Sequence, residues 1–229
     1  PTPDPTPAPT AVVLVAPELT EQRFSQEFTA EDGTVVLTVD YALPHVVNYP
    51  DSAALLAIDD RYTQMGAALL DNAASTAQDA VSDYEVSLQA GLPFQPTIEE
   101  MSYEVTFLSE RVLSVSRTFY AAAAGAAHPT VLLLGDSFDL RDGRRLTFGD
   151  LCTDVESATQ AALEAVCQSE ALAGLERQAE EAFQPDQFYL TDTGFTFWFQ
   201  PGELGASNSP IEVEVPYEAL EGYLVEWLR

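Results

Sequence analysis

The chain has 229 residues, and 37 acidic against 9 basic residues give it a net charge of −28. Every one of the nine basic residues is an arginine, which excludes chemistry that needs a lysine, such as a P-loop or a Schiff base. Nucleic acid and anionic membrane surfaces repel a polyanion, so the charge favours a cationic partner or serves solubility alone. The sequence also has no run of about 18 apolar residues that could span a bilayer.

The first ten residues, PTPDPTPAPT, carry proline at every odd position from Pro1 to Pro9. Such a segment adopts polyproline II, rises about 3.1 Å per residue and spans roughly 30 Å. A stalk of this kind is typical of exported proteins that are tethered to a membrane or wall. We therefore expect residues 1–10 to be a linker, and the protein to be extracytoplasmic, tethered by an N-terminal anchor that lies outside this sequence.

Strand-like runs joined by turn residues recur along the chain. Glycine marks three of the predicted turns, and a fourth turn is predicted near residues 109–111. The predicted hairpins cover residues 24–43, 101–120, 137–148 and 187–199. A last strand is predicted at residues 211–217, where Ile211, Val213 and Val215 alternate with other residues and should point inward.

Three amphipathic helices are predicted between and after these strands. The first covers about residues 52–80 with Asp51 as its N-cap, and the second covers about residues 154–183 with a capping box that starts at Thr153. The third covers residues 216–228, with proline at its first position. This order predicts an α+β fold, with mainly antiparallel sheets of hairpins packed against two or three long amphipathic helices.

Residues 131–140, VLLLGDSFDL, resemble the strand that delivers the nucleophile in the GDSL esterases. Catalysis by Ser137 would need a general base, which in those enzymes is a histidine near the C-terminus. Both histidines of this chain, His45 and His128, precede Ser137, and the strand runs directly into the turn at residues 141–143. We therefore predict that Ser137 is a strand residue and not a nucleophile.

Other motifs that suggest chemistry have simpler interpretations. The Asp-Thr-Gly triplet at residues 192–194 matches the active-site triplet of aspartic proteases, but the chain has one copy, so we predict a turn. Neither histidines nor cysteines have metal-ligand spacing, so we expect no metal site and no cofactor. The sequence therefore predicts a protein that is not an enzyme and has no catalytic residue.

The arginines and the cysteines carry two further predictions. Arg141, Arg144 and Arg145 form the basic cluster of the chain, and in so acidic a protein they should make internal ion pairs. Cys152 and Cys167 lie on either side of a predicted helical segment, which would hold them about 20 Å apart. That separation is beyond disulfide reach, so we expect both thiols to be free.

Four segments carry a resemblance to a known family: AHP, SFDLRDGRRLTFGDL, FYLTDTGFTFWFQP and IEVEVPYEAL, at residues 127–129, 137–151, 188–201 and 211–220. Their order resembles the extracytoplasmic domain of the RsiV-type anti-sigma factors, a region that is also an accessory part of the peptidoglycan deacetylase PdaC. Upstream, residues 41–59 resemble the companion N-terminal region. The resemblance implies two α+β regions after the linker, at residues 11–127 and 128–229.

In that family this region binds and does not catalyse, and the RsiV-type members bind lysozyme. The resemblance implies a non-catalytic binding module of a Gram-positive exported or lipid-anchored protein, with a cationic protein such as lysozyme as its partner. The alternative is a cell-wall accessory domain that binds peptidoglycan glycan or acts as a spacer. The predicted ligand-binding residues lie in two loops: His128, Pro129, Glu203, Leu204, Ser207 and Asn208.

Overall fold

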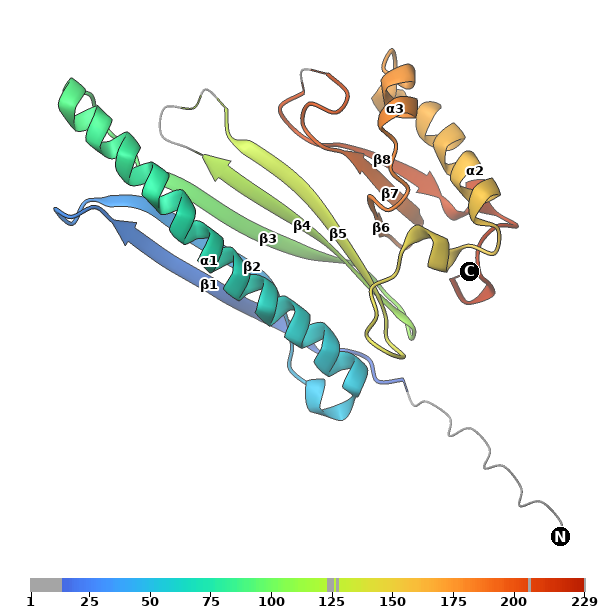
Figure 1. Cartoon of the computed structure of the whole chain (residues 1–229). Helices are drawn as coiled ribbons and strands as arrows, with labels where there is room; N and C mark the ends of the chain where they lie inside the picture. The colour runs from blue at the N-terminus through green and yellow to red at the C-terminus, as the bar shows by residue number, and fades with distance from the viewer. Residues whose placement is uncertain (1–13, 123–125, 127, 206, 229) are drawn as a thin grey trace, which may run out of the picture.

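The computed structural model describes residues 14–122, 126, 128–205 and 207–228, without the side chain of Asp51, so the linker predicted at residues 1–10 lies outside the described residues. Within the described residues the chain forms a five-stranded sheet, in the order β1-β2-β3-β4-β5, and a three-stranded sheet, in the order β6-β7-β8 (Figure 1). All neighbouring strands are antiparallel except β2 and β3. The predicted α+β class with mainly antiparallel sheets is therefore confirmed.

The larger sheet is built from two hairpins and an added edge strand. Its strands are β1 (Leu19–Thr29), β2 (Val35–Val46), β3 (Thr97–Leu108), β4 (Val112–Ala122) and β5 (Thr130–Asp139). The predicted turns at residues 31–33 and 109–111 connect β1 to β2 and β3 to β4. The hairpin predicted at residues 137–148 is reduced to one bridge, between Phe138 and Arg145, because the chain leaves the sheet after the turn.

The helix α1 (Ala53–Ala90) connects the parallel strands β2 and β3 and covers one face of the larger sheet (Figure 1). Its N-cap is Ser52, whose side chain accepts a hydrogen bond from the Ala54 amide, and not Asp51 as predicted. The helix also continues ten residues beyond the predicted end at residue 80, to the left-handed C-cap Gly91. A stripe of buried side chains at helical spacing, Leu55, Ile58 and Tyr62, faces the sheet.

A charged group is buried beside the α1 core. Arg117 on β4 bonds Asp136 on β5, with 2.7 Å between Nη2 and Oδ2, and both side chains are almost fully buried. Arg145 approaches the other Asp136 oxygen at 3.2 Å from the turn that follows β5. Two guanidinium groups thus compensate the one buried carboxylate, as a charge in a protein interior requires.

The smaller sheet has a helical layer on one face (Figure 1). Its strands are β6 (Phe188–Leu190), β7 (Gly194–Phe199) and β8 (Ile211–Pro216), and the covering helices are α2 (Val155–Cys167) and α3 (Glu176–Ala182). Every β7 residue is buried, and Val213 and Val215 on β8 point into the core as predicted. Phenylalanine rings fill the space between the layers, with Phe148 in contact with Phe188, Phe195 and Phe197.

The continuous helix predicted at residues 154–183 is wrong. The chain leaves the helix after Cys167, makes a 3₁₀ turn at Glu170–Leu172, and starts α3 after Gly174, whose φ of 83° few other residues adopt. The cap also differs: Asp154 caps α2 by accepting from the Ser157 amide. Cys152 and Cys167 are both free, as predicted, because the 13-residue helix α2 still holds them too far apart for a disulfide.

The predicted helix at residues 216–228 is also wrong. This segment forms two short 3₁₀ turns, Tyr217–Leu220 and Glu226–Leu228. Gly222 lies between them with a φ of 96°, which interrupts helical hydrogen bonding. The apolar spacing that suggested a helix instead places Leu220, Leu224 and Leu228 in the core beneath α2 and the smaller sheet.

The two sheets meet on the face of the larger sheet that α1 does not cover, which we call the outer face. There the Leu190 amide donates to the Ser114 hydroxyl at 2.9 Å, and the Gln200 side chain bonds both the amide and the carbonyl of Leu133. We call this contact the seam. The boundary predicted between residues 127 and 128 lies between β4 and β5, which pair in the larger sheet. One core lies between this sheet and α1, and the second core, around the smaller sheet, contains Val112 and the buried residues from Leu146 onward.

Candidate functional site

Through its hydroxyl, Ser137 belongs to a buried hydrogen-bonded contact between the two sheets. Its side chain is buried in the seam, where its Oγ donates to Ser114 Oγ at 3.0 Å. Ser114 in turn accepts from the Leu190 amide, so the two hydroxyls form a short chain of hydrogen bonds between the sheets. His45 is engaged elsewhere, with its Nδ1 2.8 Å from Asp59 Oδ1 on α1. The arrangement satisfies buried hydroxyls and supplies no base to Ser137.

The remaining motifs also have structural roles. Residues 192–194 form the predicted turn between β6 and β7, and the described residues contain no group of three or more histidine, cysteine or acidic side chains placed to hold a metal ion. The prediction of internal arginine ion pairs is confirmed. Arg141 bonds Asp139 at 2.6 Å, Arg144 bonds Asp150 at 2.8 Å, and Arg145 bonds Asp136.

The two predicted ligand-binding loops lie at the same end of the molecule, which we call the loop end (Figure 1). His128 and Pro129 are exposed in the loop before β5. The loop after β7 lies beside the start of β5, because Gln200 is bonded to Leu133. The structure thus brings together two loops that are far apart in the sequence.

Within the β7–β8 loop the predicted residues differ in accessibility. Asn208 is exposed, whereas the Ser207 hydroxyl donates to the Ser209 carbonyl and the Glu203 carboxylate accepts from the Gln200 amide. Leu204 is only 3% exposed and belongs to the second core, so its side chain anchors the loop and does not face solvent.

An acidic surface that the sequence analysis did not identify covers the outer face of β1, β2 and β3. We call it the acidic face. It consists of Glu21, Asp40, Glu100 and Glu104 on these three strands, together with Glu212 on β8 of the smaller sheet. Asp40 and Glu100 are register partners on neighbouring strands, and Glu104 follows on the same side because side chains alternate along a strand. A hollow of about 300 Å³ opens here, with Glu21, Asp40 and Glu100 in its lining. Glu100 and Glu104, which are four residues apart and therefore on the same side of a strand, were the sequence signal for this surface.

Tyr189 joins the acidic face to the seam. Its ring stacks on Trp198, with centroids 6.2 Å apart, and its hydroxyl donates to Glu212. Burial raises the pKa of Tyr189 above its ordinary value, and both its bond to Glu212 and the charge of Glu104 act in the same direction. The influence of both carboxylates on one hydroxyl means that acids from both sheets line this junction.

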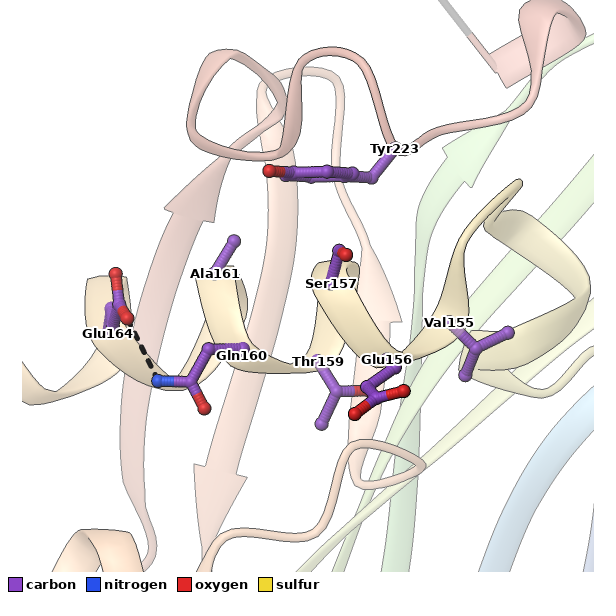
Figure 2. Close-up of a pocket in the computed structure, with 8 residues that line it drawn as sticks. All are labelled: Val155, Glu156, Ser157, Thr159, Gln160, Ala161, Glu164 and Tyr223. Atoms are coloured by element: carbon purple, nitrogen blue, oxygen red, sulfur yellow. Dashed lines mark hydrogen bonds between the residues drawn. The ribbon is translucent and has the colours of Figure 1, made fainter.

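A shallow groove of about 830 Å³ runs along α2. Figure 2 shows the Tyr223 ring lying flat over the side of the helix that carries Ser157 and Ala161, while Glu156 and Gln160 are on the other side. Gln160 bonds Glu164 within the helix at 2.8 Å. Because the polar side chains do not converge on one point, this groove has no arrangement suited to catalysis.

Among the described residues, no helix is both long and apolar enough to cross a membrane. No curated protein sequence matches this chain.

Two solved bacterial structures have a similar fold. A DUF3298 family member from Bacteroides fragilis is similar with a TM-score of 0.66 at 16% identity, over 93% of this chain and 95% of that one. A DUF3298 family protein from Pseudomonas aeruginosa is similar with a TM-score of 0.60 at 14% identity, over 93% of this chain and 97% of that one. Residues 150–218, which include α2, α3 and the smaller sheet, match the family described as a protein of unknown function, DUF3298.

Proposed function

We propose that this chain is a non-catalytic, extracytoplasmic binding module of a Gram-positive exported or lipid-anchored protein, related to the RsiV-type domains, and that it binds a cationic protein such as a lysozyme. The observation that carries this proposal is the acidic face. Its five carboxylates lie on one exposed surface, and Arg23 on β1, bonded to Glu21 and Asp40, offsets only part of their charge.

The acidic face and the loop end have complementary parts in this proposal. A concentrated negative field steers a basic protein toward the surface and raises its association rate by about 10–10³-fold at low salt. Steering alone is not specific, since any basic protein experiences it. Specificity therefore falls to the loop end, where His128, Pro129 and Asn208 are exposed and able to enter a cleft of the partner.

The aromatic side chains at the seam do not support the alternative partner, a wall glycan. Sugar recognition commonly uses exposed aromatic faces on which the rings stack. At the seam, Trp198 is 5% exposed and is covered by Tyr189, so neither ring offers a free platform of this kind.

Calorimetric titration with hen egg-white lysozyme tests the proposal. We expect saturable binding at low salt that weakens at physiological salt, and weaker binding by Glu100→Gln/Glu104→Gln. The matched control is Asp71→Asn/Asp79→Asn, which removes the same charge from exposed positions on α1, at the other face of the sheet. Equal binding to cytochrome c, or equal loss in both double variants, would leave nonspecific charge attraction, and no binding at low salt would refute the proposal.

The non-catalytic part of the proposal has its own test. Ser137 has no activating base, so an active-site fluorophosphonate probe should leave the protein unlabelled. Labelling that is abolished by Ser137→Ala would instead identify a serine hydrolase.

A further inference from the structure

The end of the molecule opposite the loop end contains a pocket of about 500 Å³, which lies between the β3–β4 hairpin and the C-terminal segment. We call this the turn end. This volume is within the range of pockets that hold small ligands or side chains. Its lining combines apolar side chains, three carboxylates and the Ser109 side of the hairpin turn: Phe107, Ser109, Asp192, Tyr217, Glu218, Glu221, Leu224, Trp227 and Leu228.

The walls of this pocket are held in place by contacts behind them. The Arg111 guanidinium stacks on the Trp227 ring, 3.8 Å from its centroid, and Asp139 lies 3.5 Å from Arg111 Nη2 to balance its charge. The Tyr217 hydroxyl donates to the Thr191 carbonyl at 3.0 Å. A pocket with walls fixed in this way loses little conformational entropy when it binds a ligand.

The three charged side chains that line the pocket are all carboxylates. Asp192, Glu218 and Glu221 are exposed, and none of the three makes an ion pair with any other residue that the structure describes. Burial raises the pKa of Tyr217 to about 12, and the charge of Asp192 acts in the same direction. Asp192 is therefore close enough to affect a group in the pocket wall.

We propose that the turn-end pocket binds an arginine or lysine side chain presented by a basic protein segment. Such a side chain has an apolar stem and a cationic head. The stem would lie against Phe107, Leu224 and Trp227, and the head would lie among the three carboxylates, which have no other compensating charge in the described structure. This site is at the other end of the molecule from the loop end, and it does not depend on the lysozyme-binding proposal.

Titration of capped acetyl-Gly-Arg-Gly-amide, followed by NMR of the two tryptophan indole N–H signals, tests this site. The matched probe replaces arginine by citrulline, which has a similar shape and no charge. We expect a saturable shift of the Trp227 signal with a dissociation constant of about 1 mM, and little shift of the buried Trp198 signal. Absence of saturation up to about 10 mM, or an equal response to the citrulline peptide, would overturn the proposal.

Charge variants locate the binding. Glu218→Gln/Glu221→Gln should weaken the arginine peptide about tenfold, because both carboxylates would contact its cation. Asp71→Asn/Asp79→Asn removes the same charge from exposed positions on α1 and should leave peptide binding unchanged. Equal effects of the two double variants would refute a local site. A protein that binds lysozyme but not the peptide refutes only this inference, and the reverse result refutes only the proposed function.

Discussion

The two cores of this protein are stabilised in different ways. The core under α1 is long and mostly aliphatic, it is formed by strands of 10 to 12 residues and a 38-residue helix, and it has the Arg117–Asp136 pair beside it. The second core is built on strands of three to six residues and depends on a few phenylalanine rings. In the larger sheet the buried surface is distributed over many side chains, whereas in the smaller sheet it is concentrated in a few rings. Truncation of one buried side chain should therefore destabilise the second core more than the first.

Phe148→Ala should have the largest effect on stability and tests whether the two cores unfold separately. Its ring contacts Phe188, Phe195 and Phe197 at centroid distances of 5.4–6.2 Å and is 1% exposed. Removing it should lower the free energy of unfolding by about 3–5 kcal/mol. Hydrogen exchange should show lost protection in β6, β7 and β8 with protection retained in β1 to β5. A uniform loss of protection would mean that the two cores unfold as one cooperative unit.

Gly135→Ala addresses the seam between the cores. A Cβ at Gly135 would lie 2.4 Å from the Phe188 carbonyl oxygen and 2.8 Å from the Trp198 ring, so the smaller sheet must move. We expect a loss of about 1–3 kcal/mol in urea unfolding followed by tryptophan fluorescence. The control is Gly149→Ala, where the nearest atom is 3.6 Å away. Equal costs for the two variants would show that the seam is not tightly packed.

The smallest expected effect concerns acid stability at the end of β5. Burial raises the pKa of Asp139, but hydrogen bonds from Arg141 and the charges of Arg141 and Arg111 outweigh it and hold the pKa below its ordinary value. A depressed pKa stabilises the fold above the unfolded value of about 3.9, and this contribution is lost as the pH falls through the folded pKa.

Unfolding by urea between about pH 6 and pH 3 measures this contribution, because that window spans the unfolded pKa. The stability of the wild-type protein should decrease more steeply with acidification than that of Asp139→Asn. Glu226→Gln, which removes an exposed carboxylate, should follow the wild-type slope. Parallel slopes for wild type and Asp139→Asn would contradict the assigned role of Asp139.

Prediction from sequence succeeded where the signal was local and failed where it was not. The β1–β2, β3–β4 and β6–β7 turns were predictable because turn residues separate clear strand runs. The helix at residues 154–183 was predicted too long because its apolar spacing continues past Cys167, although Ser169 and Gly174 are residues that start and stop helices. The apolar spacing at residues 216–228 fits a helix as well as it fits the two separate turns.

The candidate sites follow the same division. The two loops of the loop end were predictable as exposed turns, but the burial of Leu204 was not, because it depends on the second core. The acidic face needs the parallel pairing of β2 with β3, between residues about 60 positions apart in sequence. The turn-end pocket combines the β3–β4 hairpin with the β6–β7 turn and the C-terminal segment, and no spacing within one segment could indicate it.

The arginine-rich turn after β5 has a consequence for proteolysis. With no lysine in the chain, trypsin can cleave only after arginine, and three arginines, Arg141, Arg144 and Arg145, lie in this one turn between the two cores. Arg141 and Arg144 have side chains about half exposed and lie in a turn, whereas the more exposed Arg177 lies within the helix α3 and Arg117 is buried within β4. A native digest should therefore nick the chain here first, and the two fragments, each with its own core, should remain associated through the Gln200–Leu133 and Leu190–Ser114 bonds until denaturant separates them.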